Sequence, residues 1–218
     1  MRIEEAQWIS TLINKYGDDF FPLLNLGSST KDFREKAQPW INEFIFNPLL
    51  IKNKIVVHSD IKKDEGVDIA GDILDEKFAE QLKQSNFKAI ICSNVLEHIE
   101  MADVFCKAIE SIASSGTYII VTVPFLYPFH KDPIDTKFRP NIKDIEELFP
   151  QCSLQEGVIH TSNESHFSAL IRQPYTCFLT VKNWLLPRFG IKEWKMRCSD
   201  IPDLFKKYKY TWVLLRKQ

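Results

Sequence analysis

Polar residues follow four successive apolar runs of this chain, at the points where each run ends. They are Gly27, Asp60, Asp72 and the Ser93-Asn94 pair. When parallel strands form an open sheet, their carboxyl ends meet at one edge, where ligands bind. There a glycine lets the backbone approach a ligand, and carboxylates accept hydrogen bonds from ribose hydroxyls or an exocyclic amine. Because independent turns would not need a polar group at each of these places, the series predicts a nucleoside-like ligand at this edge.

Each member of the series also has a purely structural interpretation. The turn NLGSST, residues 25–30, keeps one of the three glycines of the dinucleotide-binding GxGxxG pattern and also fits an ordinary strand-to-helix turn. Asp60 lies 33 residues after Gly27, whereas that pattern places its acidic residue about 20 residues further on. Asp60 and Asp72 are also common turn residues after a strand. Since NLGSST is a poor phosphate cradle, the sequence disfavours a nicotinamide dehydrogenase.

Ionisable residues after the fourth run are candidates for contacts with a second substrate. Glu97 and His98 would face an acceptor or bind a divalent metal ion. The simpler interpretation places Glu97 at a helix N-terminus, where the helix dipole stabilises a carboxylate. We therefore assign both residues to the acceptor side and assign no metal site.

The segment after the fifth run, from Phe125 to Arg139, combines aromatic residues with ionisable groups. His130 is the candidate catalytic base, because a hydroxyl acceptor needs a proton acceptor within reach. Asp132, Asp135 and Arg139 are candidate acceptor contacts, and the guanidinium would clamp a phosphate or carboxylate. The structural alternatives are pairing of His130 with Asp132 or Asp135, and pairing of Arg139 with Asp135.

The elements that must position these residues alternate along the chain. Short apolar runs bounded by turn residues predict strands, and apolar residues spaced three or four apart predict helices. We expect strands near 20–27, 55–60, 66–74, 87–94, 117–124, 154–160 and 210–215, and helices over 1–20, 31–46, 75–84, 95–116 and 142–149. Gly116 should cap the 95–116 helix and Pro124 should end the fifth strand. The order predicts an α/β fold with a doubly wound, mostly parallel seven-stranded sheet and helices on both faces.

The length of 218 residues suffices for one α/β core and is too short for two full domains. We expect a single domain over 1–218, with an N-terminal helix at 1–20, a cofactor-binding half at 21–124 and an acceptor-side half at 125–218. The net charge of −1 argues against nucleic acid as a partner. Residues 182–218 differ, because ten Lys or Arg stand against three Asp or Glu among aromatic residues. This tail fits nucleic-acid binding, peripheral contact with a membrane surface, or a solvated face.

The five cysteines show no paired spacing of the kind that zinc sites or disulfide frameworks use. We expect all of them to be free thiols, and this usage predicts a cytoplasmic protein. The N-terminus lacks the apolar core of a signal peptide. No window reaches the roughly 18 apolar residues of a membrane-spanning helix.

Together these motifs resemble the class I, Rossmann-like methyltransferases that use S-adenosylmethionine (SAM). The resemblance rests on NLGSS, HSDI, VDIAGDIL, FKAIICSNVLEHI and SSGTYIIVTVPF, and it covers about residues 20–150. FKAIICSNVLEHI is the most specific motif, because an apolar strand, a short polar turn and LEH follow one another as in that family. The next segment is similar to a subgroup with a His-x-Asp-Pro-x-Asp element and an arginine. Many members of that subgroup act on surface glycans or secondary metabolites.

The resemblance implies a role for each residue at the ends of the strands. Gly27 and Ser28 would approach the methionine part of SAM, and Asp60 would hold the ribose. Ser93 and Asn94 would lie beside the methionine part.

The adenine side of the site has its own implied residues. Ile61 would pack on the adenine, with Asp72 and Ile73 at its edge. The chain also departs from the family pattern. Asn25 stands where the family usually has an acidic residue, and the resemblance still implies that Asn25 contacts the cofactor. Two serines replace a glycine-rich turn, and Lys88 stands where an aspartate is common.

The function that follows is SAM-dependent methyl transfer, O-directed on a small-molecule, sugar or glycan acceptor. Two alternatives remain open at this point. One is a degenerate methyltransferase fold that acts as a non-catalytic binding subunit, which the departures at the first motif favour. The other is an RNA or protein methyltransferase, which only the basic, aromatic tail favours.

Overall fold

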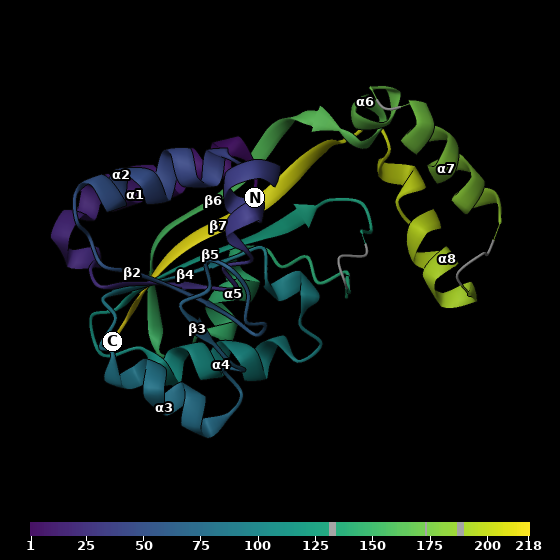
Figure 1. Cartoon of the computed structure of the whole chain (residues 1–218). Coiled ribbons are helices and arrows are strands. Elements are labelled where there is room, and N and C mark those ends of the chain that lie inside the picture. The colour runs from purple at the N-terminus through teal and green to yellow at the C-terminus, as the bar shows by residue number, and fades with distance from the viewer. Residues whose placement is uncertain (131–133, 173, 187–189) are drawn as a thin grey trace.

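The computed structural model describes residues 1–130, 134–172, 174–186 and 190–218, and its centre is a seven-stranded sheet (Figure 1). The strand order is β3-β2-β1-β4-β5-β7-β6. The first five strands run parallel, and β7 lies antiparallel between β5 and β6. This is the predicted mostly parallel sheet. The strands are β1 (Leu23–Leu26), β2 (Val56–Asp60), β3 (Ile69–Ala70), β4 (Ala89–Ser93), β5 (Tyr118–Leu126), β6 (Cys152–Ser165) and β7 (Lys207–Lys217).

Helices cover both faces of this sheet, as predicted (Figure 1). Strand β4 shows why, because its alternating residues are buried on opposite sides. Ala89 and Ile91 pack in a core with α1 and α2, whereas Ile90 and Cys92 pack in a second core with α3, α4 and α5. The helices of these layers are α1 (Ile3–Tyr16), α2 (Asn47–Ile51), α3 (Glu76–Gln84), α4 (Ala102–Ile112) and α5 (Ile142–Leu148).

Several of the expected helices have different bounds. The helix predicted over 1–20 ends at Tyr16, and a separate 3-10 turn, Gly17–Phe20, follows it. The segment predicted as one helix over 31–46 forms two π-helical turns, Phe33–Ala37 and Asn42–Phe46, before α2. The helix predicted over 95–116 is shorter, because Leu96–His98 forms a separate 3-10 turn and α4 begins at Ala102. The expectation that Gly116 caps this helix is also wrong, since α4 ends at Ile112.

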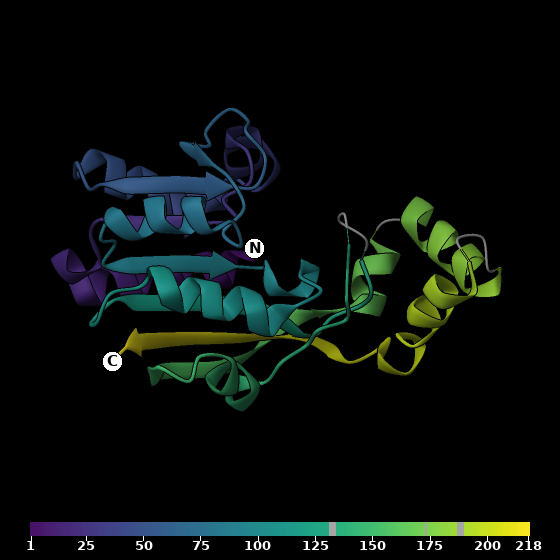
Figure 2. The ribbon, with the colours of Figure 1, turned by 90° about the horizontal axis from the view of Figure 1, so that it is seen from below.

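The C-terminal half of the chain contains the largest departures from the predicted bounds. Strand β5 continues past Pro124 to Leu126, because β7 pairs with it there, and the register shifts between these two residues. A proline has no N–H to donate, which fits such an irregular pairing. Between β6 and β7 the chain forms α6 (His166–Ile171), α7 (Pro174–Leu185) and α8 (Ile191–Cys198), which project beyond the sheet (Figure 2).

The five cysteines are free thiols, as predicted. No helix among the described ranges is both long and apolar enough to cross a membrane.

Gly27 connects β1 to the edge where the predicted site lies. Its φ is +72°, and a Cβ added there would lie 2.5 Å from Cγ2 of Val95. Gly116 also has a positive φ, +87°, but a Cβ there would meet only Arg216, at 3.9 Å. Of these two glycines, Gly27 is therefore the one at which a side chain would meet a close steric contact as well as backbone strain.

We predict that Gly27→Ala lowers the free energy of unfolding by about 1–3 kcal/mol more than Gly116→Ala does, because overpacking adds to the strain of a positive φ. Urea denaturation of both variants measures the difference. If both variants lose the same unfolding free energy, the side chain of Val95 moves aside at no cost and the prediction is wrong.

Candidate functional site

A cavity of about 1140 Å³ opens at the carboxyl ends of β1 to β4. Its walls include Glu97, His98 and His130 from the predicted acceptor side. Every residue predicted to bind the cofactor also lines it: Asn25, Gly27, Ser28, Asp60, Ile61, Asp72, Ile73, Ser93 and Asn94. The topology therefore brings the predicted cofactor residues and three of the predicted acceptor-side residues to one cavity.

The turn after β1 is held by a buried arginine that sequence reasoning missed. Arg34 donates from Nη1 to the carbonyl oxygens of Ser28, at 2.8 Å, and Ser29, at 2.7 Å. Its Nη2 donates to the carbonyl of Gly66 at 2.7 Å. Ser29 has a φ of +54°, which is unusual for a residue with a side chain. The guanidinium thus fixes a turn that lacks the usual glycines, and nothing in the local sequence pattern around Arg34 signals this contact.

The two predicted carboxylates at the cavity are oriented by backbone N–H groups. Asp60 accepts from the N–H of Ser29 at 2.9 Å and from that of Lys62 at 3.3 Å, through different oxygens. Asp72 is exposed and accepts from the N–H of Leu74 through Oδ1, at 2.9 Å. Each carboxylate oxygen has more than one lone pair, so both groups keep acceptor capacity for a ligand.

Asn25 has a neutral partner. Its amide Nδ2 donates to Nδ1 of His58 at 3.0 Å. Burial lowers the pKa of His58 to about 4, so its ring is uncharged near neutral pH. The position where the family usually has an acidic residue therefore carries no charge here.

A buried carboxylate reaches this edge from a different element, helix α1. Oε1 of Glu5 accepts hydrogen bonds from Ser93 Oγ and Asn94 Nδ2, both at 2.7 Å, and from the hydroxyl of Thr122. Its Oε2 accepts from the backbone N–H of Arg2 at 3.1 Å. Glu5 has no exposed surface. Sequence reasoning missed it, although its spacing from Ile9 and Leu12 places it on the buried face of the helix.

We predict that Glu5→Ala lowers the free energy of unfolding by roughly 3 kcal/mol, because several buried donors lose a charged acceptor. Glu5→Gln should lose less, since its amide oxygen still accepts. The matched control is Glu4→Ala in the same first turn, where the loss should stay below about 1 kcal/mol. A Glu5→Ala loss no larger than that of the control would contradict the assigned contacts.

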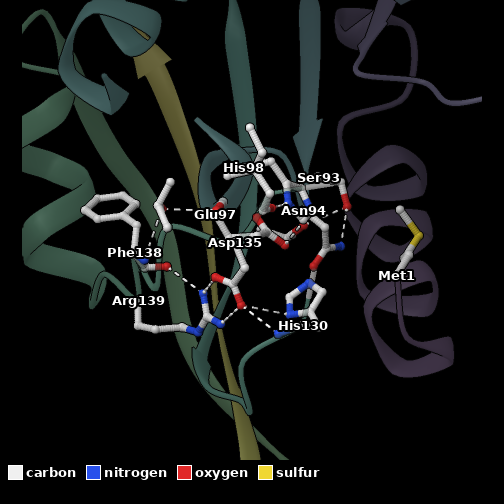
Figure 3. A network of polar contacts seen from close by, with 12 residues as sticks. Met1, Ser93, Asn94, Glu97, His98, His130, Asp135, Phe138 and Arg139 are labelled. Atoms are coloured by element: carbon white, nitrogen blue, oxygen red, sulfur yellow. Dashed lines mark hydrogen bonds and ion pairs between the residues drawn. The ribbon is translucent and has the colours of Figure 1, made fainter. Parts of the chain in front are cut away.

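On the acceptor side, Asp135 accepts from two of the predicted residues (Figure 3). Arg139 donates to both of its oxygens, at 3.0 and 2.7 Å, and Nδ1 of His130 lies 3.2 Å from Oδ2. Burial alone would raise the pKa of Asp135, but these hydrogen bonds outweigh it and hold the pKa well below its ordinary value. Burial lowers the pKa of His130, and the contact with Asp135 outweighs this effect and raises it.

The pairing alternatives for His130 and Arg139 are therefore present in the structure. Arg139 lines a separate, smaller cavity of about 200 Å³ beside Lys137 and Asp200. The side chain of Asp135, which pairs with Arg139, is fully buried and lines neither cavity. The structure thus places neither Arg139 nor Asp135 at the large cavity. The predicted contact of Asp132 lies outside the described residues.

The interpretation of Glu97 as a helix N-terminal residue is wrong. It lies in the 3-10 turn before α4, its side chain is 1% exposed, and its Oε2 has no hydrogen-bond partner. Burial raises the pKa of Glu97 to about 7. One ligand atom each from Glu97, His98 and His130 lies within 4.8 Å of the other two, so these side chains could hold a metal ion.

We predict that Glu97→Gln makes stability less dependent on pH. The folded-state pKa of Glu97 is raised, so its contribution is present below the ordinary value of 4.5 and is lost as pH rises through about 7. That rise corresponds to roughly 3 kcal/mol. Between pH 4 and 8 the unfolding free energy of wild type should fall by about this much more than that of the variant, measured by urea denaturation with EDTA present. Parallel pH profiles would contradict the buried environment of Glu97.

No family model and no curated protein matches this chain. Solved structures do. A putative sarcosine dimethylglycine methyltransferase from Galdieria sulphuraria superposes with a TM-score of 0.58, at 12% identity, over 98% of this chain and 84% of that one. Magnesium protoporphyrin IX methyltransferase from Synechocystis PCC 6803, solved with bound SAH, gives a TM-score of 0.54 at 11% identity, over 99% and 83%.

These likenesses define the class I methyltransferase fold for this chain. The cyclase SpnF shares it as well, with a TM-score of 0.52 at 12% identity, over 95% of this chain and 80% of that one. At such identities the likeness shows the fold and not the reaction, because one fold carries many activities. The residues that line the cavity, and not the fold, determine the reaction.

Proposed function

We propose that this protein is a SAM-dependent methyltransferase, O-directed on a small-molecule, sugar or glycan acceptor. The observation that carries the proposal is that one cavity joins all nine predicted cofactor residues to the Glu97, His98 and His130 cluster. A cavity that spans both groups suits a reaction between two bound molecules. Solved structures of this fold include methyltransferases, one of them with bound SAH.

The donor set at the strand ends fits a nucleoside linked to an amino acid. Asp60, held by two backbone N–H groups, has the geometry to accept from ribose hydroxyls. Ile61 is 66% exposed and Ile73 is buried, and both line the cavity, so they offer apolar surface to an adenine ring. Gly27 and Ser28 line the cavity at the place where the methionine part would lie. These residues would hold SAM, which supplies a methyl group on a sulfonium sulfur.

The O-directed assignment rests on His130. Its Nδ1 faces the ionised Asp135, which accepts a hydrogen bond and has no proton to give, so Nδ1 carries the proton and Nε2 keeps a lone pair. A histidine oriented by a carboxylate in this way is suited to accept a proton from an acceptor hydroxyl. Tyr127 packs edge-on against His130 at 5.3 Å and lines the same cavity. It supplies an aromatic wall that excludes water from this side.

A second function is favoured by one observation, the uncharged Asn25–His58 pair at the end of β1. A chain that had lost the acidic residue of this motif would serve as a binding subunit without turnover. The missing charge at Asn25 is offset in part by Glu5 of α1, whose carboxylate lies at the end of the neighbouring strand, β4.

The proposal predicts that S-adenosylhomocysteine (SAH) binds to the wild-type chain in isothermal titration calorimetry. Asp60→Ala should weaken this binding by about 1.5–3 kcal/mol, the scale of charge-assisted hydrogen bonds. The control is Asp18→Asn, which removes an exposed carboxylate before β1, at the opposite edge of the sheet, and should leave the affinity unchanged. Absence of binding at millimolar SAH would overturn the methyltransferase proposal.

A further inference from the structure

Three side chains with metal-binding atoms converge on the acceptor end of the cavity. Glu97 and His98 come from the 3-10 turn after β4, and His130 comes from the segment after β5 (Figure 3). One ligand atom from each lies within 4.8 Å of the other two, and all three residues line the cavity. A set of two imidazoles and one carboxylate is a known ligand set for divalent transition metals, with coordination positions left open.

Both histidines are oriented as metal ligands usually are. Nδ1 of His98 contacts the carbonyl oxygen of Ile134, and Nδ1 of His130 contacts the carboxylate of Asp135. Neither acceptor has a proton to give, so in the neutral rings each Nδ1 is the protonated nitrogen and each Nε2 keeps its lone pair. Metal-binding histidines almost always donate their other ring N–H to a carboxylate or a backbone carbonyl, because this fixes the tautomer and the ring orientation.

The carboxylate of the set lacks a partner. Oε2 of Glu97 is buried without a hydrogen bond, and the Glu97 side chain is 1% exposed. A buried oxygen of this kind is costly unless something satisfies it. Arg139 does not take this role, because it donates both Nη groups to Asp135.

The turn that carries Glu97 is itself fixed by the segment that carries His130. Thr136 donates from its N–H, at 2.9 Å, and from its hydroxyl, at 3.1 Å, to the carbonyl oxygen of Glu97. The two elements that supply ligands are therefore locked to one another. Binding of an ion would require little rearrangement of the backbone.

We infer that Glu97, His98 and His130 form a binding site for one divalent transition-metal ion, with its open positions facing the cavity. The site itself stands independently of methyl transfer. Its role, which rests on the proposed function, is to bind an acceptor hydroxyl or a pair of acceptor oxygens, since a bound metal lowers the pKa of an oxygen ligand. With the ion present, Nε2 of His130 would be a ligand and the metal would take over the activation. The metal-bound hydroxyl would lose its proton to solvent, and its oxygen would then bond to the methyl carbon of SAM as the bond from that carbon to the sulfonium sulfur breaks, which leaves SAH.

The test uses Mn²⁺ alone, because this ion favours oxygen and nitrogen ligands over the five free thiols. The loss of the free Mn²⁺ signal in electron paramagnetic resonance measures binding to the untagged, EDTA-treated chain. Wild type should bind one equivalent. Glu97→Gln and His130→Gln should each weaken binding by at least about 10-fold, the loss seen even for outer-shell partners of metal ligands.

The matched control is Glu100→Gln, which changes an exposed glutamate three residues further along the same edge. This variant should keep the wild-type affinity for Mn²⁺. Far-UV circular dichroism and SAH calorimetry establish that each variant is folded. Failure to bind Mn²⁺ at millimolar concentration, or equal affinity in wild type, Glu97→Gln and His130→Gln, would overturn the metal site. SAH binding in the same samples would then leave the methyltransferase proposal standing, with His130 as the base.

Discussion

The buried carboxylate of Glu5 is the interaction on which the edge of the sheet depends. It lies inside the protein with no exposed surface, so it must be hydrogen-bonded. Its partners are Ser93 and Asn94 at the end of β4, and Thr122 in the middle of β5. These contacts fasten α1 to the same edge that forms the cavity. They also fix Asn94, whose φ of +53° is an uncommon conformation that surrounding contacts must hold. The predicted cofactor side of the cavity is thus shaped by Glu5, which does not line it.

Asp135 has the corresponding role at His130, on the predicted acceptor side of the cavity. Its carboxylate holds Arg139 and His130, and it also accepts from the backbone N–H groups of His130, at 2.9 Å, and Lys137, at 2.8 Å. A fully desolvated charge of this kind is stable only when its partners are complete. The two buried carboxylates therefore fix different parts of the cavity. Glu5 holds the end of β4, and Asp135 holds His130 and Arg139 in the segment after β5.

The sequence predicts the sheet well because its signals are local. Each central strand is short, apolar and buried on both faces, and the polar residue that ends it necessarily falls at the carboxyl edge. The cavity residues Gly27, Asp60 and Asn94 follow from this rule alone. Glu5 was within reach of the same reasoning, because a glutamate on the apolar face of a helix demands a buried partner.

Other features depend on contacts between distant parts of the chain, which periodicity does not reveal. Glu97 looks like the start of a helix, yet the contact of Thr136 with its carbonyl fixes a separate turn and buries the side chain. Strand β5 passes Pro124 because β7, from the end of the chain, pairs with it. The sequence offers the pair of Arg139 with Asp135 only as an alternative to substrate contact. Their separation of four residues fits an internal ion pair and equally fits an arginine that binds an anionic substrate.

The central claim is that the carboxyl edge of β1 to β4 binds SAM. A crystal structure of the chain grown with SAH tests it most directly. The account predicts density for SAH with its ribose hydroxyls at the Asp60 carboxylate, its adenine between Ile61 and Ile73, and its methionine part beside Gly27. Density for SAH elsewhere, or an empty cavity at millimolar SAH with the edge accessible in the crystal, would contradict the account.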